Sequence, residues 1–169
     1  MGPAYVEERT TASLAGRYLT FRLANEIYGI EILRVQEIIG LMAITKIPRA
    51  PECIRGVINL RGKVIPVIDL SLRFGLPVKE DTSRTCIIVI QFRSEHGMVI
   101  VGMVVDDVAE VVNVTVEQLE PPPDFSQDDE EALLLGIGKL GGNVVMLLDV
   151  DRVLSSHEIN AVSNTTAQV

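Results

Sequence analysis

The chain of 169 residues is long enough for one domain, or for two small domains that share a core. Hydrophobic residues make up 47% of it and aromatic residues only 4%, so the core consists mainly of Val, Ile and Leu, which favour β-structure. The formal net charge of −8 argues against a nucleic-acid-binding or anionic-membrane-binding protein, because both functions need a surplus of Lys and Arg.

The N-terminal part predicts a disordered tail followed by a strand. Residues 1–16 contain no apolar segment of signal-peptide length and are expected to be disordered. Residues 18–24 alternate, with Leu19, Phe21 and Leu23 on one face, as in a half-buried strand. No apolar run reaches membrane-spanning length, which predicts a soluble, cytoplasmic protein.

The middle of the chain predicts further short strands. Residues 63–70 form a strand whose Pro66 indicates an edge position or a bulge, and residues 71–77 form one helical turn. Two apolar runs, 85–92 and 97–105, flank a short polar segment and predict a hairpin. Many short strands separated by turns are typical of an all-β barrel or sandwich.

The C-terminal part combines a loop, a strand pair and a short helix. Residues 120–132 are rich in Pro and acidic residues and predict a surface loop. Residues 148–163 predict a short helix capped by Asp149 or Asp151, and the end of that helix and a tail occupy residues 156–169.

The chain contains an internal repeat. Residues 56–70 align without a gap to residues 136–150, at a spacing of 80 residues, and residues 29–39 align to residues 102–112, at a spacing of 73. Two matches in the same order indicate a tandem duplication, with repeat one at about 17–80 and repeat two at about 84–155. Chance similarity between aliphatic strands is the alternative. The duplication predicts two small barrels.

A glycine motif at residues 136–142 first suggests a nucleotide-binding protein. Gly136, Gly138 and Gly141 spell G-x-G-x-x-G, which holds a pyrophosphate when a helix follows it. Here a strand follows, and the repeat partner of the motif is also a turn between strands. The three glycines therefore predict a β-hairpin turn that needs positive φ angles.

No catalytic or metal-binding constellation is visible in the sequence. Asp106 and Asp107 are neighbours on a strand, where their side chains point to opposite faces, and Asp149 and Asp151 suit capping and solvation. The two cysteines, Cys53 and Cys86, predict reduced thiols, with a single disulfide as the alternative. We therefore predict a binding protein with no cofactor and no metal.

Two segments are candidate binding surfaces. Residues 46–63 contain five basic residues and one acidic residue, which suggests an acidic partner surface; alternatively, Arg61 braces the turn by bonding to backbone carbonyls. Ile39, Leu41 and Met42 have few polar neighbours and form either core or an exposed edge that docks another barrel.

Several motifs together resemble the CheW family of bacterial chemotaxis coupling proteins. They are YGIEILRVQEI (28–38), PECIRGVINLRGKVIPVIDL (51–70), VGMVVDDVAEVV (101–112) and LEPPPDF (119–125), and the similarity spans residues 17–155. The resemblance implies an all-β domain of two interleaved, five-stranded SH3-like barrels. It also implies a non-enzymatic scaffold that couples chemoreceptor cytoplasmic tips to the regulatory domain of a CheA-type histidine kinase, within membrane-associated receptor arrays.

The resemblance also implies which residues bind the partners. Val35 and Glu37 match the receptor-binding region of the family, Arg61 matches its signature arginine, and Gly56 and Gly102 match glycines that line the same neighbourhood. Asn59, which differs between the two repeats, joins the predicted receptor-binding set. The predicted kinase-binding edge consists of Ile39, Leu41 and Met42. Asp107 stands where the family often has Gly, which affects either a turn or a partner contact.

Overall fold

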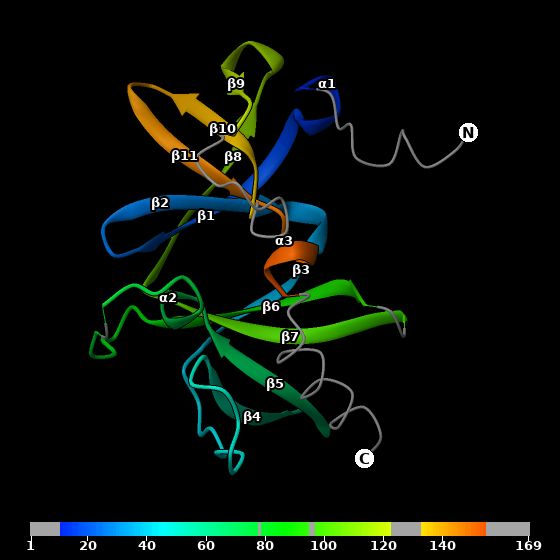
Figure 1. Cartoon of the computed structure of the whole chain (residues 1–169), viewed down its shortest axis with the longest axis vertical. Coiled ribbons are helices and arrows are strands. Elements are labelled where there is room, and N and C mark those ends of the chain that lie inside the picture. Colours follow the sequence, from blue (N-terminus) through cyan, green and yellow to red (C-terminus); the bar gives the residue numbers. More distant parts are fainter. Residues whose placement is uncertain (1–10, 78, 95–96, 123–132, 155–169) are drawn as a thin grey trace.

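The computed structural model describes residues 11–77, 79–94, 97–122 and 133–154, which form two β-barrels, one above the other in Figure 1. Barrel 1, the upper one, comprises β1 (Gly16–Leu23), β2 (Glu26–Glu31), β8 (Asp107–Val114), β9 (Leu119–Glu120), β10 (Leu134–Leu140) and β11 (Asn143–Leu148). Barrel 2 comprises β3 (Val35–Gly40), β4 (Ile54–Leu60), β5 (Lys63–Asp69), β6 (Cys86–Ser94) and β7 (Gly97–Val105). The remaining elements are short helical turns: α1 (Thr11–Leu14), η2 (Ile32–Arg34), α2 (Leu70–Arg73), η3 (Val116–Gln118) and α3 (Val150–Val153). The predicted all-β fold of two small SH3-like barrels is confirmed.

Each barrel combines strands from both copies of the repeat. The strand order is β8-β1-β2-β11-β10 in barrel 1, followed by the two-residue β9, and β3-β6-β7-β5-β4 in barrel 2. Replacing every strand by its counterpart in the other copy converts one order into the other. The parallel strand pairs also agree in register. In barrel 2, Val67 lies opposite Gly102. Their counterparts in the other copies, Leu147 for Val67 and Gly29 for Gly102, lie opposite each other in barrel 1. The predicted duplication and interleaving are therefore confirmed.

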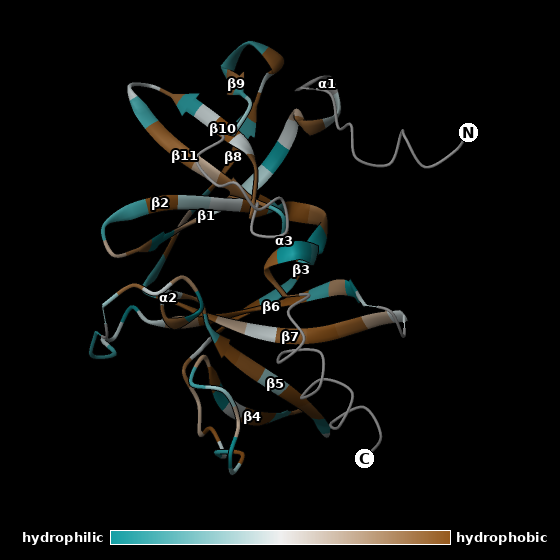
Figure 2. Ribbon diagram, in the orientation of Figure 1, coloured by the Kyte–Doolittle hydropathy of each residue, from teal (hydrophilic) through white to brown (hydrophobic). Residues whose placement is uncertain are grey.

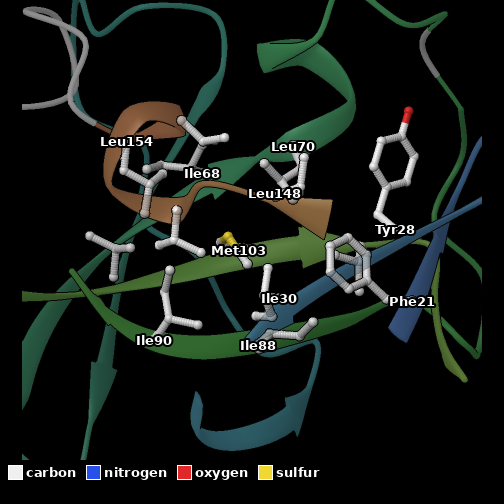
Figure 3. Close-up of a cluster of buried hydrophobic side chains, with 14 of the residues drawn as sticks. Phe21, Tyr28, Ile30, Ile68, Leu70, Ile88, Ile90, Met103, Leu148 and Leu154 are labelled. Carbon is white, nitrogen blue, oxygen red and sulfur yellow. The ribbon is translucent and has the colours of Figure 1, made fainter. Parts of the chain in front are cut away.

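The largest hydrophobic cluster joins the two barrels. Phe21 and Ile30 of barrel 1 pack with Ile88 and Met103 of barrel 2, as Figure 3 shows, and all four are at most 1% exposed. Burial of each such side chain stabilises the fold by about 1.5–3 kcal/mol. Strands β5 and β7 are largely hydrophobic along their length in Figure 2, as expected for a parallel pair in a barrel wall. The barrels thus share one core.

Strand β1 separates this shared core from a smaller core inside barrel 1. Leu19, Phe21 and Leu23 face the shared core, as the alternation predicts, whereas Tyr18 belongs to the smaller core. Tyr18 and Thr20 are 1% and 2% exposed, so the expectation of a half-buried strand is wrong for this part of β1, whereas Arg22 on the same face is exposed as expected. Barrel 1 closes over the second face at Tyr18 and Thr20.

The glycine motif lies in a hairpin, as predicted, but its first two glycines are not in the turn. Gly136 and Gly138 belong to strand β10, and the turn to β11 uses Gly141 and Gly142, whose φ angles are +56° and +85°. Gly136 is needed for another reason: a Cβ there would lie 2.9 Å from the carbonyl oxygen of Glu120. Because a strand follows the motif, no helix N-terminus is available for a phosphate.

The chain ends differ in part from expectation. The predicted disordered tail through residue 16 is too long, because α1 occupies Thr11–Leu14 and the Leu14 side chain is 6% exposed. The Leu14 carbonyl accepts a hydrogen bond from the Tyr18 hydroxyl at 2.7 Å, which fixes α1 to barrel 1. At the other end Asp149 caps α3 by accepting from the Arg152 backbone N–H. The predicted tail at residues 156–169 lies outside the described residues.

Two predictions around β5 have different outcomes. The helical turn predicted at residues 71–77 is confirmed as α2, which Asp69 caps and after which Gly75 adopts a φ of +71°. The edge position predicted from Pro66 is wrong, because β5 lies between β4 and β7. Pro66 is tolerated because the ladder to β7 begins only at Val67, and the bulge lies in the partner strand β4 between Ile54 and Gly56.

An ion pair fixes the C-terminal helical turn to the first copy. The Arg34 guanidinium of η2 donates two hydrogen bonds, of 2.7 and 2.6 Å, to the Asp151 carboxylate of α3, and they raise the pKa of Arg34. Asp151 also accepts from the Arg93 backbone N–H at 3.0 Å. We expect Asp151→Ala to lower the free energy of unfolding by about 1–2 kcal/mol. Urea unfolding checks this; Asp151→Asn, which keeps one acceptor, should lose less, and equal stability of all three proteins would contradict the role of the pair.

Candidate partner-binding surface

The most distinctive surface feature is an ion pair between Glu37 and Arg61. Glu37 lies in β3, and Arg61 lies in the turn between β4 and β5, so the pair joins two segments 24 residues apart in the sequence. The hydrogen bond to Glu37 raises the pKa of the Arg61 guanidinium. The Arg61 side chain is still 70% exposed, which leaves donors free to face a partner.

The turn that carries Arg61 has an unusual sequence for its geometry. Arg61 and Gly62 adopt φ angles of +52° and +88°, a pattern that favours Gly, Asn or Asp at both positions. Asn59 supports the turn, because its side-chain oxygen accepts a hydrogen bond of 2.9 Å from the Gly62 N–H. The exposed Val64 lies opposite Asn59 in the hairpin. We call Glu37, Asn59, Arg61 and Val64 the Arg61 surface.

The other predicted receptor-binding residues do not lie on this surface. Val35 is half-buried and packs against the shared core. Gly56 and Gly102 are buried inside barrel 2. A Cβ at Gly56 would lie 2.1 Å from the Thr45 carbonyl oxygen, and a Cβ at Gly102 would lie 2.7 Å from the Ile87 side chain. Close packing, against the Thr45 backbone at Gly56 and against the Ile87 side chain at Gly102, therefore accounts for both glycines.

The predicted kinase-binding edge is partly core. Ile39 and Leu41 pack against the hydrophobic cluster of barrel 2, whereas Met42 is 38% exposed. Sequence reasoning missed the neighbouring Ile38, whose side chain is 44% exposed and lies on the outer face of β3. The structure separates the two residues, because burial alternates along β3 and leaves Ile38 exposed between the half-buried Glu37 and Ile39, whereas the sequence has two adjacent isoleucines and gives no signal to tell them apart.

The basic segment 46–63 is less available to partners than its composition suggests. Arg55 donates to Asp69 at 2.9 Å and to both oxygens of Asp81 at 2.9 and 2.8 Å. Arg61 donates to the Glu37 carboxylate, so the alternative prediction that it braces the turn through backbone carbonyls is not what the structure shows. Lys46 and Arg49 are exposed and form no ion pair within the described part of the chain.

The pair between Arg55 and Asp81 predicts acid-sensitive stability. Its hydrogen bond lowers the pKa of Asp81 below the ordinary 3.8, so the folded protein binds fewer protons than the unfolded chain near that pH. The contribution of this pair to folding stability is present above the ordinary pKa of Asp81. It is lost as the pH falls through the lower pKa that Asp81 has in the folded protein. Because Asp81 is 41% exposed, we expect Asp81→Asn to cost under about 1 kcal/mol near pH 7, and less near pH 3. Urea unfolding at both pH values checks this, and an equal cost at both would contradict it.

Asp106 and Asp107 form structural contacts with different partners. Asp106 accepts from the Ala24 N–H at 2.9 Å and faces Lys79, whereas Asp107 faces Arg84 at 3.7 Å, so the two carboxylates do not share a site. No group of three or more His, Cys, Asp or Glu side chains in the described residues is arranged to hold a metal.

Cys53 and Cys86 are not joined in a disulfide, and burial raises the pKa of Cys86. None of the helices in the described ranges is long and apolar enough to cross a membrane.

Comparison with known proteins shows similarity along nearly the whole chain. The family model of the CheW-like domain matches residues 17–158. A chemotaxis protein CheW of Klebsiella aerogenes is 39% identical over 163 residues, which cover 96% of each chain, and protein FrzA of Myxococcus xanthus is 30% identical over 86% of this chain and 89% of that protein. The crystal structure of the scaffolding protein TtCheW from Thermoanaerobacter tengcongensis aligns with a TM-score of 0.74 and 35% identity, over 85% of this chain and 95% of that one. The similarity therefore includes both barrels.

Proposed function

The chain belongs to the CheW-like domain family of chemotaxis scaffold proteins, and from this premise we propose that it couples the cytoplasmic tip of a chemoreceptor to a CheA-type histidine kinase. It acts by binding both partners and catalyses no reaction. It works in the cytoplasm and is recruited to membrane-associated receptor arrays. The observation that carries the proposal is the Arg61 surface, an exposed arginine held by Glu37 on a turn that favours Gly or Asn.

The chemistry of the Arg61 surface suits a helical receptor tip. A charged pair beside the exposed Val64 can contact the polar and apolar sides of an amphipathic helix together. Glu37 fixes the guanidinium, so less side-chain entropy is lost when a partner binds. Val35 supports β3 from the core side, which makes it a positioning residue for Glu37.

The kinase docks on a different part of barrel 2 in this proposal. Ile39 and Leu41 pack against the core of barrel 2 and so fix the position of this edge. The exposed Ile38 and Met42 provide the apolar contact area. Edge strands with exposed apolar side chains favour pairing with another β-structure, which suits a kinase domain built from similar barrels. Separate surfaces let the protein hold receptor and kinase at once.

The direct test is phosphorylation of the kinase in receptor-containing membranes, with and without the protein. A large rise that requires both receptor and protein supports the proposal. If the protein binds the kinase without any rise, it serves a receptor of another chemosensory pathway. Without a rise or any binding, the proposed coupling is wrong.

A further inference from the structure

The loop between β3 and β4, cyan at the bottom of Figure 1, contains an arginine in the left-handed backbone region. Residues 47–50 form a turn in which the Ala50 N–H donates to the Ile47 carbonyl at 3.3 Å. Pro48 takes the second position, and Arg49 takes the third with a φ of +62°. Proline followed by positive φ is the pattern of a type II turn, whose third position favours Gly or Asn.

Arg49 shares this strained placement with Arg61. Four non-glycine residues in the described ranges have positive φ, and the two arginines among them both lie in barrel 2. At the position of Arg61, the other copy of the repeat has Gly141, with a φ of +56°. Strained backbone concentrates at functional sites, because a residue better suited to the conformation would otherwise replace it. Arg49 is therefore a candidate contact residue.

The charge of Arg49 is available to a partner. Arg49 is exposed and forms no ion pair with a carboxylate of the described residues, and the same holds for Lys46. By contrast, Arg55 and Arg61 are held by carboxylates of this chain. Glu52 is the single acidic residue of the same loop, so Lys46 and Arg49 leave the loop with a surplus of positive charge on a protein whose net charge is −8, which favours an acidic partner group.

A groove of about 450 Å³ lies beside this turn. Its apolar lining comes from Ile44, Ile47, Ala50, Pro51 and Ile54, and its polar lining from Lys46, Glu52 and Arg55. Ile44 follows Leu41 and Met42 in the loop after β3 and packs against the same cluster as Leu41, so the chain that lines the groove continues from the edge proposed for kinase docking. The turn contributes Ile47 and Ala50 to the groove, and Arg49 lies between these two lining residues in the sequence, at the edge of the groove.

We propose that Arg49 and this groove bind a segment of the kinase in which an apolar side chain stands next to a carboxylate. The apolar side chain fills the groove, and Arg49 pairs with the carboxylate, assisted by Lys46. This inference rests on the proposed function and adds to it the residue that selects the kinase segment. Arg49 determines specificity here, because a segment without the carboxylate would leave its charge unpaired.

The test compares kinase binding by the wild type and by Arg49→Asn, measured by calorimetry with the purified kinase. Asn suits the left-handed conformation and removes the charge, so the thermal midpoint should stay equal or rise while the affinity falls about tenfold. Arg49→Glu should lower the affinity further. Arg17→Asn, which removes an exposed arginine from barrel 1, serves as the control and should bind like the wild type.

The outcomes separate this inference from the proposed function. If the wild type does not bind the kinase, the proposed function fails. If the wild type binds and Arg49→Asn binds equally well, the role of Arg49 is overturned while the coupling function stands. Sedimentation adds one more result: self-association that Arg49→Asn abolishes, with kinase affinity unchanged, would assign the groove to a second copy of this chain and overturn the inference.

Discussion

The variant Arg61→Glu is expected to fold normally and to abolish receptor-dependent stimulation of the kinase. The Arg61 side chain is 70% exposed on a turn, so its replacement disturbs no core contact. The new carboxylate would face Glu37, and repulsion between like charges would remove both the guanidinium and its fixed orientation from the surface. We expect stimulation in receptor-containing membranes to fall about tenfold or more, with an unchanged thermal midpoint.

Two further variants decide how Arg61 acts. Arg61→Asn suits the positive φ of the turn and removes the charge, so it should be at least as stable as the wild type but inactive. Combining Glu37→Arg with Arg61→Glu restores an ion pair in the reverse orientation. Recovery of coupling by this double variant would assign the pair a purely structural role, whereas continued loss supports direct contact of Arg61 with the receptor. Normal coupling by a folded Arg61→Glu protein would contradict the proposed surface.

The fold could be predicted largely because the chain repeats itself. The alignment of Gly56 with Gly136 and of Gly29 with Gly102 identified strands that occupy matching places in the two barrels. Strand periodicity, however, reports only whether a face is apolar, not how many cores surround it. Tyr18 and Thr20 lie on the face that looks polar in the sequence, and the closure of barrel 1 buries both. Such closure depends on contacts between distant strands, which local patterns do not encode.

The candidate site could be predicted only in part, for a similar reason. Resemblance grouped residues that matter to the family without distinguishing surface from interior, so Arg61 and the buried Gly102 appeared together. Composition suggested a basic patch, but two carboxylates of this chain neutralise Arg55. They belong to Asp69 and Asp81, which lie 14 and 26 residues further along the chain. The positive φ of Arg49 has no sequence signal except the proline before it.

Gly56→Ala is expected to unfold barrel 2 rather than to remove a receptor contact. The φ of Gly56 is +143°, in a region that is essentially restricted to glycine, and the added Cβ would lie 2.1 Å from the Thr45 carbonyl oxygen. Thr45 cannot move away easily, because its N–H and carbonyl both bond to Val57, at 2.9 and 2.8 Å. We expect a loss of about 3 kcal/mol or more in the free energy of unfolding, measured by urea denaturation.

The internal repeat supplies a matched control for this prediction. Gly136 is the counterpart of Gly56, its φ lies outside the left-handed region, and its added Cβ would lie 2.9 Å from the Glu120 carbonyl oxygen. Gly136→Ala should therefore cost less, about 1–3 kcal/mol. If Gly56→Ala instead unfolds like the wild type but loses receptor binding, Gly56 is a contact residue despite its burial. If binding is lost only in proportion to unfolding, the family's glycine serves the fold, and receptor recognition belongs to the side chains around Arg61.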